Sequence, residues 1–168
     1  MRNPFEIVQW FEDAIAEYTG APYAIATTSC TESIFLCCKY LNIQNCEVTI
    51  PDKTYLSVPQ SIIQAGGILK FEDLEWQGAY QLKPFPIYDS AKRLTSNMYI
   101  KNSYMCLSFH HKKHLKIGKG GMILTDNPEQ AARGLTLLSD YPKNVEDLKE
   151  DPPYRSLSTF DLFKESKI

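Results

Sequence analysis

Apolar and polar positions along this chain change period repeatedly, which predicts helices and strands in alternation. Residues 7–18 carry apolar side chains at helical spacing, with Asn3 and Pro4 before them as a helix start and Gly20 after them as a stop. Further helices are predicted over residues 29–40, 55–64 and 127–139, and strands over residues 23–28, 47–50, 68–71, 86–89, 104–109 and 122–125.

The order of these elements is typical of a layered α/β domain with a mostly parallel sheet. Such sheets bind ligands beyond the carboxyl ends of their strands. Polar clusters follow three predicted strands, at residues 28–31, at Asp89 and from Ser108 onward. From Asp140 onward the apolar positions no longer follow a helical or strand period. We therefore expect one α/β domain over residues 1–140 and an irregular tail or arm over residues 141–168.

Composition narrows the function classes. The 168 residues have room for one domain, and 43% hydrophobic with 23% charged residues argue against whole-chain disorder. With 18 Lys and Arg against 20 Asp and Glu, the net charge is −2. The chain as a whole therefore lacks the positive charge that proteins use to bind nucleic acid or an anionic membrane. No apolar run approaches the ~20 residues of a membrane span, and the N-terminus has no apolar signal core, so we expect a cytoplasmic protein.

The five cysteines are odd in number and show no C-x-x-C spacing. This argues against both a disulfide framework and a zinc knuckle. In a reducing compartment, buried thiols acting as small apolar side chains are the expected outcome.

The densest chemical signal is the segment 108–121, which holds all three histidines of the chain and four lysines. His110 and His114 have i, i+4 spacing, but no acidic residue accompanies them and lysines repel a cation, which disfavours zinc. One interpretation of this segment is a solvated basic loop. An anion site is the other, because Ser108 at a strand end and Lys113 five residues later suit a phosphate beside an amine nucleophile.

Each of three other clusters can be interpreted as purely structural or as part of a chemical site. Residues 28–31 form a strand-to-helix turn that either caps the helix or cradles a phosphate. Asp89 is either a turn aspartate or a partner for a ring nitrogen, and Tyr55 is either a core aromatic or a stacking surface. All the clusters together fit one ligand with a phosphate, a planar basic ring and a carbonyl that an amine attacks, and pyridoxal phosphate (PLP) has these groups.

The order of these segments resembles the DegT/DnrJ/EryC1/StrS sugar aminotransferases, which are fold-type I PLP enzymes. The resemblance covers about residues 5–140 and rests on segments 5–20, 23–26, 29–31, 51–55, 65–67, 88–91, 108–113 and 118–126. It implies the large domain of that fold, a three-layer α/β/α arrangement, with the family's small C-terminal domain missing.

The resemblance also implies roles for single residues. Lys113 matches the lysine that forms the internal aldimine with PLP and then moves protons, with Lys112 as its competitor. Ser108 matches a serine on the cofactor phosphate. Asp89 matches the aspartate that pairs with the pyridinium nitrogen, which keeps the ring an electron sink.

Three further positions follow from the same resemblance. Cys30 and Thr31 match the turn whose N–H groups and hydroxyl hold the phosphate, and Tyr55 matches the aromatic that stacks on the ring. Lys92 departs from the pattern, because the family usually has Gln or His there, near the phenolic oxygen of the cofactor. A lysine at this place either pairs with that oxygen or disturbs the site.

The resemblance implies an aminotransferase that moves an amino group from a donor such as glutamate to a keto sugar nucleotide, acting as a homodimer. Two alternatives remain. The chain is a truncated, non-catalytic paralogue that binds PLP or a full-length partner without turnover, or it is an anion-binding domain without PLP. Asp89 argues against the last, because its charge repels a second anion.

Overall fold

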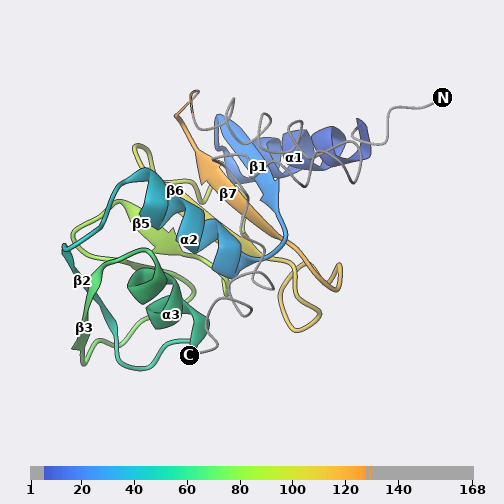
Figure 1. Ribbon diagram of the computed structural model, residues 1–168. Helices are drawn as coiled ribbons and strands as arrows, with labels where there is room; N and C mark the ends of the chain where they lie inside the picture. The colour runs from blue at the N-terminus through green and yellow to red at the C-terminus, as the bar shows by residue number, and fades with distance from the viewer. Residues whose placement is uncertain (1–5, 128, 130–168) are drawn as a thin grey trace, which may run out of the picture.

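A computed structural model describes residues 6–127 and 129 (Figure 1). The helices are α1 (Glu6–Thr19), α2 (Cys30–Tyr40) and α3 (Ser57–Gln64). The strands are β1 (Tyr23–Thr27), β2 (Glu47–Pro51), β3 (Ile68–Glu72), β4 (Tyr80–Gln81), β5 (Ile87–Asp89), β6 (Tyr104–Ser108) and β7 (Gly121–Thr125). The predicted tail over residues 141–168, and nearly all of the helix predicted over residues 127–139, lie outside the described residues.

The α/β class is confirmed, but the expectation of a mostly parallel sheet was too simple. The main sheet has the strand order β1-β7-β6-β5-β4, and β2 and β3 form a second sheet. The pairs β2·β3 and β5·β6 are parallel, whereas β1·β7, β6·β7 and β4·β5 are antiparallel. The reason is that no helix connects β4 to β5 or β6 to β7, and only a crossover connection returns a strand in the parallel direction.

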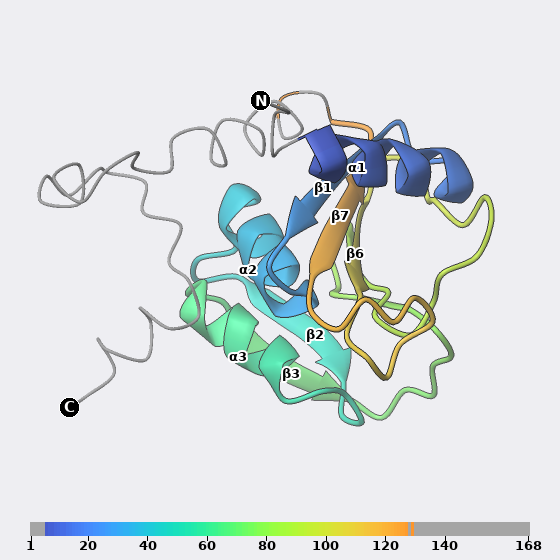
Figure 2. The same ribbon diagram turned by 90° about the vertical axis from the view of Figure 1, so that its right-hand side faces the viewer.

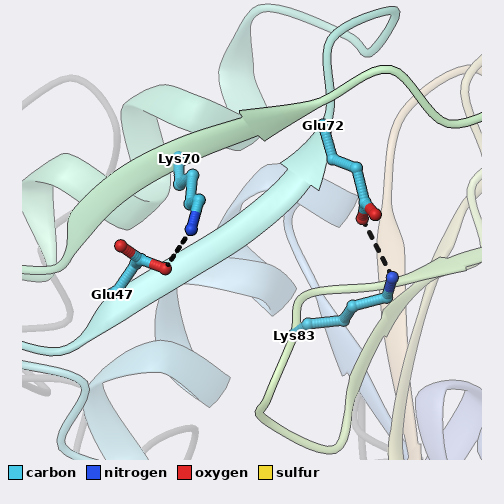
Figure 3. A network of polar contacts seen from close by, with 4 residues as sticks. All are labelled: Glu47, Lys70, Glu72 and Lys83. Atoms are coloured by element: carbon cyan, nitrogen blue, oxygen red, sulfur yellow. Dashed lines mark hydrogen bonds and ion pairs between the residues drawn. The ribbon is translucent and has the colours of Figure 1, made fainter.

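The two sheets meet at a single antiparallel bridge between Thr49 in β2 and Lys83 after β4. Each residue donates its N–H to the other's carbonyl oxygen, at 2.8 and 3.0 Å. The side chain of Lys83 also reaches Glu72 of β3 at 2.9 Å, next to a Glu47–Lys70 pair of the same length that joins β2 to β3 (Figure 3). These exposed ion pairs add little stability.

Helices cover both faces of the main sheet, with α1 on one side and α2 and α3 on the other (Figure 2). Alternate side chains of each strand serve the two faces: Cys106 and Ile123 pack beneath α2, whereas Leu107 and Met122 pack on the α1 side. Asp89 has the same parity as Ile87, which lies in the α2 cluster. The candidate site residues of β5 and β6 therefore face α2.

The cysteines behave as small apolar residues, and none forms a disulfide among the described residues. Cys30, Cys37, Cys38 and Cys106 are buried and Cys46 is half-buried. None of the helices within residues 6–127 is long and apolar enough to cross a membrane.

The side chain of Glu12 in α1 is buried although it is acidic, with 4% of the residue exposed. Its Oε1 accepts the N–H of Ala26 at 2.7 Å. Since β1 is an edge strand of the sheet, this bond satisfies a backbone donor that has no neighbouring strand on that side. Burial raises the pKa of the Glu12 carboxyl, and the nearby Asp13 adds to the rise against the opposing effect of the Ala26 bond.

We expect Glu12→Gln to fold stably and Glu12→Ala to lose about 1–3 kcal/mol, because the alanine variant leaves the Ala26 N–H unsatisfied. The pKa of Glu12 is higher in the folded than in the unfolded chain. Its contribution to the free energy of unfolding is therefore complete below the unfolded pKa and decreases as pH rises through the folded pKa. Wild type should therefore lose stability relative to Glu12→Gln from about pH 4.5 upward. Urea unfolding over that pH range measures the free energy of unfolding, with the exposed Glu17→Gln as the control. The same pH dependence in wild type, Glu12→Gln and Glu17→Gln would contradict the prediction.

Candidate active site

The candidate site lies where β5 and β6 end. Asp89 is the last residue of β5 and pairs in register with Cys106 of the parallel strand β6. Ser108 follows two residues later on the same face of β6 and ends that strand. The strand pattern alone thus places a carboxyl and a hydroxyl side by side beneath the start of α2.

Asp89 is the buried carboxyl group at this edge, with 5% of the residue exposed. Its Oδ1 accepts the N–H of Ala91 at 2.9 Å, and the thiol of Cys30 lies 3.9 Å from the same oxygen. Its Oδ2 accepts the hydroxyl of Tyr80 at 2.8 Å. Burial raises the pKa of the Asp89 carboxyl, and these hydrogen bonds and the charges of two lysines offset part of that rise.

The two lysines that act on Asp89 are Lys113 and Lys92. Neither forms an ion pair with it, and within the described residues all of the donors at hydrogen-bond distance from the carboxyl are neutral. A buried carboxylate without a cation in contact is unfavourable. A small cationic group in contact with Asp89 would therefore stabilise its ionised form.

The start of α2 provides donors beside this carboxyl. Ser29 is the N-cap and accepts the N–H of Glu32 at 3.1 Å, while the Glu32 carboxylate accepts the N–H and hydroxyl of Thr28 at 2.7 and 2.6 Å. Glu32 thus reaches back to Thr28, the residue before the N-cap, in an arrangement related to the capping box. Thr31 donates its hydroxyl to Ser57, the first residue of α3, at 2.8 Å. The first-turn N–H groups of Cys30 and Thr31 are of the kind that bind anions.

A glycine brings the strand end and the helix start together. Gly121 pairs with Ser108 in the sheet, and a Cβ at Gly121 would lie 2.3 Å from the carbonyl carbon of Ser29 and 2.5 Å from the nitrogen of Cys30. Only glycine allows this backbone contact. The end of β6 at Ser108 and the start of α2 at Cys30 are therefore both adjacent to Gly121.

Lys113 differs from the other lysines of its loop. It is half-buried, whereas Lys112, Lys116 and Lys119 are exposed. The loop turns back at this point, since the N–H of Lys113 donates to the carbonyl of His110 at 2.8 Å. Its charge is close enough to lower the pKa of both Asp89 and Cys30, although burial dominates and the pKa of each remains raised. The geometry distinguishes Lys113 from Lys112.

Tyr55 and Lys92 lie at the rim of the site. Tyr55 precedes α3 and is 77% exposed, so it does not pack in the core of the described residues. Lys92 is exposed, and its Nζ lies 5.0 Å from the ring centroid of Trp76. This cation–π contact directs the amine toward the indole ring.

Sequence reasoning did not identify Tyr80 and Trp76, which line the site next to Asp89. Their rings pack edge to face with centroids 4.7 Å apart. The indole N–H of Trp76 donates to the carbonyl of Lys53 at 2.9 Å. The available signal was weak: two aromatics four residues apart, in a segment with neither helical nor strand period. Among the described residues, no group of three or more His, Cys, Asp and Glu side chains is arranged to hold a metal ion.

Solved structures share this fold at low sequence identity. DesI, solved in the presence of its TDP-sugar product, superposes with a TM-score of 0.64 at 19% identity, over 82% of this chain and 45% of its own. DesV of S. venezuelae gives 0.65 and 17%, over 82% and 49%. The PLP form of Spr1654 from Streptococcus pneumoniae gives 0.60 and 17%, over 78% and 50%.

The chain thus spans about half the length of the solved structures that it matches. No curated protein sequence matches it. Its residues 2–95 and 99–147 match the sequence profile of the DegT/DnrJ/EryC1/StrS aminotransferases. By this match, which covers most of the chain, the protein belongs to the DegT/DnrJ/EryC1/StrS aminotransferase family.

Proposed function

We propose that this chain binds PLP and transfers an amino group from an amino acid such as glutamate to a keto sugar nucleotide. The observation that carries the proposal is the buried Asp89, which lacks a cation in contact among the described residues. A protonated ring nitrogen supplies the missing positive charge. Membership of the family and the PLP form of Spr1654 support the same cofactor, and the TDP-sugar product of DesI supports the substrate class.

The residues present fit the three functional parts of this cofactor. The first-turn N–H groups of Cys30 and Thr31, with the hydroxyl of Ser108, would hold the phosphate. Asp89 would accept the ring N–H, and Tyr55 offers an exposed aromatic face for the ring.

When bound, PLP supplies an electron-withdrawing ring that stabilises negative charge developing beside the amino group. The chain's own residues create the conditions for this. An ionised Asp89 would hold the proton on the ring nitrogen, because its carboxylate would lie buried beside that nitrogen. The amine of the half-buried Lys113 would hold the cofactor covalently and would carry a proton to and from the reacting carbon.

The direct test adds PLP to the purified protein and follows the absorption spectrum. We expect a band at about 410–430 nm, which reports the covalent lysine–cofactor bond. Addition of glutamate should then remove that band and release 2-oxoglutarate. A colourless protein at saturating PLP would overturn the proposal.

A second function is favoured by Lys92, which stands where the family usually has Gln or His and directs its amine toward the Trp76 ring. In this alternative the protein binds PLP without turnover. A stable band after glutamate addition, without 2-oxoglutarate, would identify this alternative.

The proposal includes a homodimer acting in the cytoplasm. Large apolar side chains stand exposed on the described residues, among them Ile7 at 70% and Leu56 at 69%. Exposed apolar surface of this kind favours association. A monomer in light scattering at micromolar concentration would contradict the dimer.

A further inference from the structure

Two hydroxyl groups form a chain that ends on Asp89. The hydroxyl of Thr54, in the loop after β2, contacts the hydroxyl of Tyr80, and Tyr80 in turn reaches Oδ2 of Asp89 at 2.8 Å. An ionised carboxylate only accepts hydrogen bonds, so the proton of Tyr80 points to Asp89 and the proton of Thr54 points to Tyr80. Each bond in such a chain polarises and strengthens the next.

Packing holds the phenol ring of Tyr80 in place. Tyr80 is 4% exposed and lies in the core cluster beneath α2, with Trp76 against its ring edge. β4 also pairs Tyr80 directly with Asp89 across the antiparallel hairpin. The donor therefore reaches Asp89 from a fixed ring, without the entropy cost of ordering a mobile side chain.

The other groups around Asp89 leave room for one more donor. Oδ1 already has the N–H of Ala91 and the thiol of Cys30, whereas Oδ2 has only the hydroxyl of Tyr80 among the described residues. A carboxylate offers about four acceptor positions. The free position is therefore on Oδ2, beside the Tyr80 hydroxyl.

We propose that Tyr80 is a positioning residue that keeps Asp89 ionised and fixes Oδ2 toward the cationic nitrogen of a bound ligand. The inference deepens the proposed function and rests on it for the identity of the ligand. The hydrogen bond from Tyr80 acts on the charge of Asp89 in the cofactor-free protein as well. This effect can therefore be measured without any cofactor.

The charged and titratable groups that face Asp89 set the background for this measurement. Lys113 from the loop after β6 and Lys92 after β5 favour the ionised carboxylate. The thiols of Cys30 in α2 and Cys106 in β6 are buried and have raised pKa values through that burial, so they stay neutral at ordinary pH. Tyr80 is likewise neutral, because burial and the charge of Asp89 raise its pKa.

The test titrates Asp89 in cofactor-free protein by carboxyl ¹³C NMR, with the signal assigned through Asp89→Asn. Tyr80→Phe keeps the ring and removes the hydroxyl, and we expect the pKa of Asp89 to rise by about one unit. Thr54→Val removes only the second hydroxyl, and we expect a smaller rise. Tyr88→Phe is the matched control, because Tyr88 is the neighbouring residue of β5 and packs on the opposite face.

A space-filling role for Tyr80 would leave the pKa of Asp89 unchanged in Tyr80→Phe, as in Tyr88→Phe, and that result overturns the inference. If Tyr80→Phe does not fold, the direction of the shift in Thr54→Val decides. In PLP-titrated protein, Tyr80→Phe should bind about tenfold more weakly than Tyr88→Phe. A wild type that does not bind PLP would refute the proposed function, while the cofactor-free titration would still test the role of Tyr80.

Discussion

Replacing Lys113 with alanine should abolish the absorption band that PLP produces with wild type. Lys113 is half-buried, and the charge of its amine opposes the dominant effect of burial that raises the pKa of Asp89 and of Cys30. Without it, the covalent bond to the cofactor is lost. Loss of proton transfer alone should slow the glutamate half-reaction by roughly 10²–10⁴-fold. Spectra of PLP-titrated protein and stopped-flow measurement of the half-reaction test both effects.

Lys112→Ala is the matched control. Lys112 is the adjacent residue of the same loop and carries the same charge, but its side chain is exposed. This variant should keep the band, and after borohydride reduction the added mass should map to the peptide with Lys113. A band that survives in Lys113→Ala and disappears in Lys112→Ala would reverse the assignment.

Gly121→Ala should be the most damaging single-methyl substitution in the described part of the chain. Its Cβ would lie 2.3 Å from the carbonyl carbon of Ser29 and 2.5 Å from the nitrogen of Cys30. Both are backbone atoms, so no side-chain rotation relieves the contact. Displacement of α2 from β7 should cost about 3 kcal/mol, at the upper end for overpacking, and lower the Tm by roughly 6–12 °C.

Gly118→Ala separates this contact from backbone strain. Gly118 has a φ of +115°, but a Cβ there meets no atom within 4 Å. It should therefore cost only about 1–2 kcal/mol, the usual penalty for a left-handed backbone with a side chain. Thermal unfolding of both variants compares the two costs, and equal losses would mean that the contact with α2 carries no extra energy.

The helices and long strands could be predicted because each has a clear period and a clear boundary residue. Ser29 is the N-cap of α2, and Gly20, with a φ of +74°, follows the end of α1. The two-residue strand β4 could not be predicted, because two residues have no period. Its position creates the contact between Tyr80 and Asp89, so the sequence predicted the carboxyl and not its partner.

Strand direction was harder to predict than strand position. Alternating helices and strands favour parallel pairing, but β4·β5 and β6·β7, which are joined by loops without a helix, are antiparallel. The segment between β6 and β7 is such a loop, and it carries Lys113. The choice between Lys112 and Lys113 also depended on burial, which two adjacent lysines in a loop do not reveal in the sequence.

The single bridge between Thr49 and Lys83 has a consequence for how the protein responds to ligands. Thr54, Tyr55 and Trp76 lie on connections of the β2–β3 sheet, whereas Asp89 and Ser108 end strands of the main sheet. Only two backbone hydrogen bonds join the sheets at this bridge, and apolar packing within one shared core cluster adds to their contact. A molecule that touches both sheets would add polar links between them, so that occupancy itself stabilises the fold.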